Sequence, residues 1–227
     1  MAYLRLRRML ELAGLDRPGL ARLLARADRA PRHAPTAQWE GYYAAGTYDS
    51  LMAPDRRHHH RLLAGLIAER RPRARILEIG CGQGAFYESL RHLDFASYEG
   101  SDIAPLAIRL ARERYVDDVA AGRADFRVAD GADPRPGQLY DAVIIADCIE
   151  YLGPVRETLA RVGAMLAPDG LIGVTQWMAS HPLALWRELQ PAVTIVDQAV
   201  VLAPWGGAWQ VWTGRPRTGS CGGDADG

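Results

Sequence analysis

The sequence predicts an α/β fold in which a doubly wound, mostly parallel sheet of seven strands ends in an antiparallel hairpin. From residue 75 onward, short apolar runs of strand character alternate with helical patterns, as in parallel sheets that are covered by helices. The last two runs are joined by residues 204–207, which are too few for a helix and therefore indicate a hairpin. A glycine-rich stretch at residues 80–84 follows the first run, where a strand passes into a helix.

The individual elements follow from apolar periodicity and from the turn residues between them. Strands are expected at residues 75–79, 96–101, 125–129, 140–146, 171–176, 193–202 and 208–213. Helices are expected at residues 55–70, 85–92, 104–119 and 153–166. Leucines at helical spacing also predict helix within residues 3–29, and the glycine-rich end of the chain, residues 215–227, is expected to be disordered.

Composition excludes several classes of protein. The 27 basic residues balance the 27 acidic ones, so the chain as a whole is not a polyanion binder. The three cysteines are too few and too widely spaced for a disulfide framework, which favours a reducing, cytoplasmic setting. No run approaches the ~18 consecutive apolar residues that a membrane span needs.

The stretch ILEIGCGQG, residues 76–84, places glycines at every second position after a strand. The spacing differs from the Gly-x-Gly-x-x-Gly pattern of dinucleotide sites, although ligands of doubly wound sheets do bind at this edge. Asp102 follows the second strand and can accept hydrogen bonds from a ribose diol. Asp130 follows the third strand and can accept a hydrogen bond from an adenine amine.

With the fourth-strand motif YDAVIIADCIEYL and the fifth-strand entry LAPDGLIGV, these features resemble the class I S-adenosylmethionine-dependent methyltransferases. The resemblance runs from about residue 75 to 176, and the hairpin extends it to 213. It implies S-adenosylmethionine as cofactor, with its carboxylate on backbone N–H groups of the glycine stretch. The cofactor-binding residues that it implies are Glu78, Gly80, Cys81, Gly82, Gly84, Asp102, Ile103, Asp130, Gly131, Asp147, Cys148 and Tyr43.

The catalytic candidates are His181, Asp147 and Tyr151. His181, in the loop after the fifth strand, is the first choice for a general base, and a plain exposed loop histidine is the alternative. Tyr151 stands where many relatives of the family have histidine, so simple packing remains open for it. The Asn-Pro-Pro-Tyr signature of amino-methylating DNA enzymes is absent.

The chain is expected to divide into three parts. Residues 1–54 form a helical arm and an aromatic lid segment, residues 55–214 the methyltransferase domain, and residues 215–227 the tail. Three consecutive histidines, His58, His59 and His60, are expected to point in three directions as surface or lid residues, and contact of one of them with the methyl acceptor is the alternative. Because they lack the i, i+4 spacing of paired helix ligands, we expect no metal site.

These observations predict methyl transfer to an O or N atom of a small polar metabolite, either a saccharide or a specialised biosynthetic intermediate. One alternative is an RNA or protein methyltransferase that docks through the basic arm. Another is a cofactor-binding scaffold subunit without catalysis. Neutral charge and the lack of an added RNA-binding module count against nucleic-acid partners. We expect no DNA or membrane partner, and a homodimer remains open.

Overall fold

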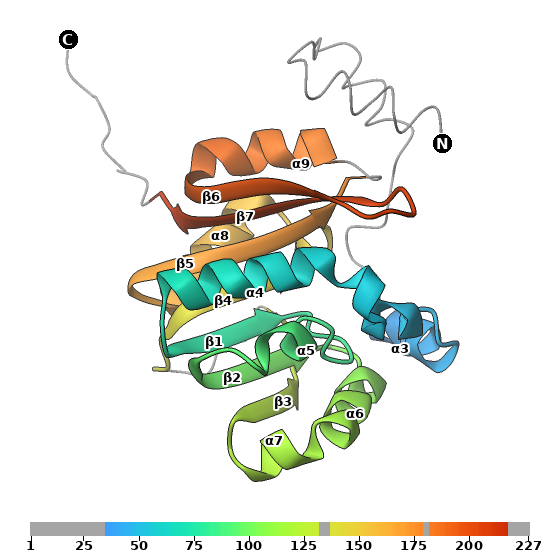
Figure 1. The fold of residues 1–227 in the computed structure, drawn as a ribbon. Coiled ribbons are helices and arrows are strands. Elements are labelled where there is room, and N and C mark those ends of the chain that lie inside the picture. Colours follow the sequence, from blue (N-terminus) through green and yellow to red (C-terminus); the bar gives the residue numbers. More distant parts are fainter. Residues whose placement is uncertain (1–34, 132–136, 179–181, 218–227) are drawn as a thin grey trace, which may run out of the picture.

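A computed structural model describes residues 35–131, 137–178 and 182–217 of the 227-residue chain (Figure 1). The helix expected within residues 3–29 and nearly all of the tail expected at 215–227 lie outside this described part. Within it, no helix is both long and apolar enough to cross a membrane.

The predicted seven-stranded sheet is confirmed, with the strand order β3-β2-β1-β4-β5-β7-β6. Strands β1 to β5 pair in parallel, whereas β7 runs antiparallel to both β5 and β6. The strands span Ala74–Ile79 (β1), Phe95–Asp102 (β2), Ala124–Val128 (β3), Tyr140–Ala146 (β4), Leu166–Trp177 (β5), Val193–Leu202 (β6) and Ala208–Pro216 (β7).

Strand β5 begins five residues before its predicted start at 171. Leu166 already pairs with Tyr140, and the register then shifts before Leu171 pairs with Ala142. Asp169, where φ is +63°, lies inside the strand at this irregularity.

Helices cover both faces of the sheet (Figure 1). Ala142, Ile144 and Ala146 of β4 pack into one core with α4 (His58–Arg70) and α6 (Pro105–Arg114). Val143 and Ile145 face a second core with α8 (Val155–Met165) and α9 (Pro182–Leu189). This alternation along one strand is the period-2 pattern of a strand that is buried on both sides.

Two predicted helices are shorter or divided. The helix expected at 85–92 is the single turn α5, Tyr87–Leu90. The one expected at 104–119 separates into α6 and α7 (Val116–Ala120) at Tyr115, whose backbone leaves helical geometry (φ −111°, ψ 34°). The buried Tyr115 ring stacks on Phe126 and its hydroxyl donates to the Gly84 carbonyl, so tertiary packing outweighs helix propensity here.

The carboxyl ends of the parallel strands β1, β2 and β4 lead into Gly80, Asp102 and Asp147, as doubly wound topology requires of a ligand site. The segment before α4 comprises α3 (Thr36–Ala44) and the short 3₁₀ helices at Asp49–Met52 and Pro54–Arg56. We call residues 36–56 the lid segment, since its residues line the pocket at this edge of the sheet.

Candidate active site

The glycine turn after β1 is built so that only glycine fits. Gly80, Gly82 and Gly84 have φ values of +71°, +53° and +85°, a region that residues with a Cβ atom rarely adopt. A Cβ atom on Gly80 would lie 2.6 Å from Cys148 Sγ, and one on Gly82 would lie 2.8 Å from Tyr43 Oη. The turn therefore brings bare backbone to the pocket, which Gly80, Cys81 and Gly82 line.

The N–H groups of this turn are used within the protein. Gly80 and Cys81 both donate to the carbonyl of Ser101, and Gly84 donates to the carbonyl of Cys81. Gly82 donates to the carboxylate of Asp102. These four N–H groups thus pin the turn to β2 and to itself, and the expectation that the N–H groups of the stretch bind a ligand carboxylate stays open only for Gln83.

Asp102 lies at the end of β2 as predicted and is 8% exposed. Its Oδ2 accepts from Gly82 N and its Oδ1 from Ala104 N, both at 2.9 Å. Burial raises the pKa of this carboxyl group, while the backbone donors oppose that rise. An ionised carboxylate has about four acceptor positions, so Asp102 can still accept from a diol in the pocket that it lines.

Asp130, predicted for the adenine amine, also borders this pocket, as do the predicted cofactor-binding residues Ile103 and Gly131. A Cβ atom on Gly131 would lie 2.3 Å from Ile79 Cγ2, so a larger residue would displace this wall.

Glu78 is buried beneath the site and bonded to the hydroxyl of Tyr98. Burial raises the pKa of Glu78 to about 8, with smaller contributions from the charges of Asp102 and Asp147. The side chain is therefore mainly protonated at neutral pH. The folded core thus favours the neutral form of Glu78.

The lid segment is bonded to the rim of the pocket in several places. Asp49 accepts a hydrogen bond from Gln83 Nε2 at 2.9 Å, and the Trp39 ring meets the Tyr151 ring edge-on at 5.0 Å. Tyr43 reaches over Gly82, and burial strongly raises the pKa of its hydroxyl. The lid thus supplies a wall that the strands alone lack.

The pocket has a volume of about 1230 Å³ and is lined by the glycine turn, Asp102 and the lid segment. Single small ligands usually occupy ~300–1,000 Å³, so there is room for a cofactor and a second molecule. Beyond Asp147, the lining is aromatic and comes from Trp177, Trp205 and Trp209. The guanidinium of Arg56 lies 4.1 Å from the ring centre of Trp205.

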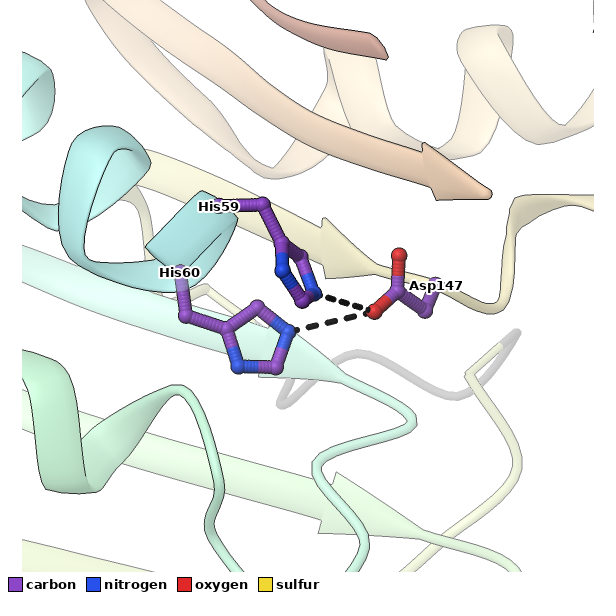
Figure 2. A group of neighbouring side chains, drawn as sticks. All are labelled: His59, His60 and Asp147. Carbon is purple, nitrogen blue, oxygen red and sulfur yellow. Dashed lines mark hydrogen bonds and ion pairs between the residues drawn. The ribbon is translucent and has the colours of Figure 1, made fainter. Parts of the chain in front are cut away.

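Two histidines of α4 meet Asp147 at the end of β4 (Figure 2). Nε2 of His59 lies 2.8 Å from Asp147 Oδ2, and Nε2 of His60 lies 3.3 Å from the same oxygen. His59 is fully buried and His60 is 3% exposed. The expectation that these histidines are divergent surface or lid residues is therefore wrong. Only His58 fits it, as it bonds to Arg61 in an exposed position.

Asp147 adopts φ +56°, unusual for a residue other than glycine, and Thr175 Oγ1 donates to its Oδ1 at 2.8 Å. Burial alone would raise the pKa of Asp147, but hydrogen bonds and charge from His59 and His60 hold it below its usual range. Burial in turn lowers the pKa of His59. Of these three residues, Asp147 and His60 line the pocket.

The other predicted residues have varied placements. Cys148 lines the pocket, and its Sγ donates to the Ile79 carbonyl at 3.1 Å. Burial raises the pKa of Tyr151 to about 12, so its hydroxyl stays protonated. Glu150 lines the pocket, its Oε2 has no hydrogen-bond partner within the described part of the chain, and burial raises its pKa to about 7. His181 lies outside the described residues.

Comparison with known proteins agrees with this geometry. The family described as "Methyltransferase domain" matches residues 77–172. Nocamycin O-methyltransferase of Saccharothrix syringae is 31% identical over 145 residues, which cover 63% of this chain and 51% of the relative. This chain thus spans about half the length of that curated relative.

Solved structures share the fold. The N-methyltransferase NodS from Bradyrhizobium japonicum WM9, in complex with S-adenosylhomocysteine, superposes with a TM-score of 0.59 at 22% identity, covering 72% of this chain and 88% of NodS. The 1,6-didemethyltoxoflavin-N1-methyltransferase of Burkholderia thailandensis gives a TM-score of 0.61 at 20% identity, covering 83% of this chain and 92% of that enzyme. Strand order, glycine turn and strand-end acids agree with this likeness: the chain has the methyltransferase fold, and residues 77–172 match the family described as "Methyltransferase domain".

Proposed function

We propose that this protein binds S-adenosylmethionine and transfers its methyl group to an O or N atom of a small polar metabolite. The observation that carries the proposal is a single pocket that joins the glycine turn and Asp102 to the aromatic region beyond Asp147. A two-substrate transfer needs the cofactor and the acceptor in one such enclosure.

The cofactor fits the half of the pocket near β1, β2 and β3. Its ribose hydroxyls would donate to Asp102, and its adenine amine would donate to Asp130. Its methionine part would lie along Gly80 and Gly82 beneath Tyr43, where side chains are excluded. The sulfonium, a cation, would then be near the carboxylate of Asp147, which remains ionised.

The chemistry would be an in-line displacement at carbon. The acceptor atom attacks the methyl carbon while the carbon–sulfur bond breaks, and S-adenosylhomocysteine leaves. Positioning and exclusion of water can supply much of the rate, because the sulfonium is already activated. A hydroxyl acceptor must also lose its proton, and the polar groups that line this half of the pocket include His60, Asp147 and Glu150.

The acceptor would lie against the three tryptophans of the pocket. Trp177 and Trp205 are 47% and 39% exposed although they are large and apolar, whereas Trp209 is nearly buried. Indole faces of this kind bind flat rings or the apolar face of a sugar. This supports the proposed class of acceptor, a saccharide or a specialised biosynthetic intermediate, and likeness to nocamycin O-methyltransferase supports it too.

Calorimetric titration tests the cofactor half of the proposal. We expect micromolar binding of S-adenosylhomocysteine and S-adenosylmethionine and no binding of NAD. A folded sample that binds neither adenosyl compound would overturn the proposal.

Where both bind, acceptors are screened with methyl-labelled S-adenosylmethionine. Flat phenols, amines and saccharides are compared with RNA and peptides, and label found only in RNA or protein would refute the small-metabolite class.

A further inference from the structure

We propose that His59, His60 and Asp147 form a binding site for a divalent transition-metal ion of the zinc type. The role of that ion at the acceptor rests on the methyl transfer proposed above. Ion binding itself does not, because its ligands, on α4 and just after β4 (Figure 2), do not include the glycine turn or Asp102.

Three ligand atoms converge on one point. The Nε2 atoms of both histidines and a carboxylate oxygen of Asp147 all lie within 4.8 Å of one another. The two nitrogen–oxygen distances are 2.8 and 3.3 Å. Ligands at ~2.0–2.2 Å from a tetrahedral ion stand roughly 3.3 Å apart, so both nitrogen–oxygen distances are within about 0.5 Å of that spacing.

Three of the four histidine nitrogens are poorly satisfied in a buried place. Among the described residues, Nδ1 of His59 and Nδ1 of His60 have no hydrogen-bond partner, and Nε2 of His60 has only its 3.3 Å ion-pair contact with Asp147, which falls short of hydrogen-bond geometry. His60 is only 3% exposed, and its Nε2 is aimed at the oxygen that His59 already engages (Figure 2). Buried polar nitrogens without a well-formed hydrogen bond are rare, and an ion between the rings would replace this weak contact of His60 Nε2 with a ligand bond.

The ligands are also held in orientation from behind. Thr175 Oγ1 donates to Oδ1 of Asp147, which leaves Oδ2 turned toward the histidines. The ring of Trp209 stacks on the ring of His59 at 4.2 Å with an interplanar angle of 7°. Outer contacts of this kind fix ligand geometry at metal sites.

Ligand chemistry selects the ion. Two imidazoles and one carboxylate suit Zn²⁺ and related ions, whereas Mg²⁺ prefers an all-oxygen shell. Three protein ligands leave at least one coordination position for water or substrate. Because His60 and Asp147 line the pocket, that position faces the proposed acceptor.

The ion would act on a hydroxyl acceptor without any redox change. The acceptor oxygen replaces a bound water and loses its proton to solvent, since coordination lowers the pKa of the hydroxyl. The oxygen then forms its bond to the methyl carbon as the carbon–sulfur bond breaks. Bound metal would thus favour an oxygen acceptor over the nitrogen acceptors that the proposed function also allows.

Cobalt binding tests the site directly. The full chain is treated with chelator, dialysed and titrated with Co²⁺, whose visible absorption reports a low-symmetry nitrogen–oxygen shell, and then with Zn²⁺ as competitor. We expect one Co²⁺ per chain, displaced by Zn²⁺ and unaffected by Mg²⁺. His60→Ala and Asp147→Asn should weaken binding by more than the roughly 10- to 100-fold typical of losing an outer contact. Thr175→Val should fall within that range.

His58→Ala is the matched control, because His58 is the neighbouring helix residue and lies outside the cluster. It should retain full Co²⁺ binding. Loss of binding in His58→Ala, with retention in His60→Ala, would show only surface chelation by consecutive histidines and would overturn the site. Absence of the cobalt spectrum in folded wild-type protein would also overturn it and leave a hydrogen-bonded His–Asp cluster.

Two further measurements keep the result interpretable. Circular dichroism and thermal unfolding show whether each variant folds, and Zn²⁺ should raise the Tm of the wild type but not that of Asp147→Asn. S-adenosylhomocysteine binding is measured on the chelated protein. Cofactor binding without metal binding refutes only the metal site, whereas metal binding without cofactor binding refutes only the proposed transfer.

Discussion

The carboxylate of Glu40 accepts a hydrogen bond at 2.7 Å from the backbone N–H of Leu106, a residue 66 positions away in the chain. Glu40 belongs to α3 of the lid segment, and Leu106 lies in the first turn of α6, just after Asp102. The first N–H groups of a helix have no partner within it and favour negative charge. The lid is therefore fastened to the helix that follows the proposed ribose-binding acid.

Removing this fastening should loosen the cofactor. We expect Glu40→Ala to weaken S-adenosylhomocysteine binding by roughly three- to tenfold, which corresponds to one hydrogen bond of about 0.5–1.5 kcal/mol. The change should lie in the dissociation rate, since the lid opens before release. Stopped-flow fluorescence measures that rate. Glu113→Ala, an exposed change on the same α6, is the control, and equal dissociation rates in both variants would contradict a closing role for α3.

Asp102 should be the most sensitive side chain of the cofactor half. In Asp102→Asn, one carboxylate oxygen becomes an NH₂ group, which cannot accept from Gly82 N, Ala104 N or a ribose hydroxyl. We expect a loss of about 1.5–3 kcal/mol in binding free energy, or roughly 10- to 150-fold in Kd by calorimetry.

Asp141→Asn is a suitable comparison, because Asp141 stands at the opposite end of the sheet and pairs with Arg75. It should leave Kd unchanged. Retained affinity in Asp102→Asn would mean that the ribose lies elsewhere in the pocket.

Two glycines with positive φ allow the cost of backbone strain to be separated from the cost of a steric clash with an added Cβ atom. Gly84 and Gly122 both have positive φ, at +85° and +69°. A Cβ atom on Gly122 meets nothing within 4 Å, whereas one on Gly84 would lie 2.5 Å from the ring of Tyr115. Gly122→Ala should therefore cost only about 1–2 kcal/mol of backbone strain. Gly84→Ala should cost clearly more in urea unfolding, because the buried Tyr115 ring must also move. An equal loss of unfolding free energy in the two variants would mean that the Tyr115 ring can shift at little energetic cost.

The sequence predicted the sheet, the glycine turn and Asp102 because these depend on local patterns and one topological rule. Strands end where apolar runs end, and parallel strands bring their ends to one edge. Helix ends were less predictable: the division at Tyr115 depends on its packing against Phe126, which is 11 residues away in the chain but adjacent in space.

The cluster of His59, His60 and Asp147 was missed for a different reason. Three consecutive histidines suggest an exposed run, and no local pattern shows that α4 passes over the end of β4. One signal was present. His59 precedes Leu63 by four residues, and His60 precedes Ala64 by four, so both extend the buried stripe of α4 by one turn.

Glu78 should make the stability of the protein depend on pH. Its pKa is about 8 in the folded protein, against a usual value of 4.5. Between those values the folded state binds more protons than the unfolded state, so the stability that this group contributes falls as pH rises through that window. The slope for one proton is at most about 1.4 kcal/mol per pH unit.

Glu78→Gln keeps an acceptor for Tyr98 and removes this titration. In urea unfolding from pH 5 to 9, we expect the free energy of unfolding of the variant, relative to that of the wild type, to rise with pH up to about pH 8. Above that pH the difference between the two should stay constant. Glu113→Gln, at an exposed position, should show no such divergence. A difference between Glu78→Gln and wild type that stays constant over the whole range would mean that Glu78 is ionised in the fold.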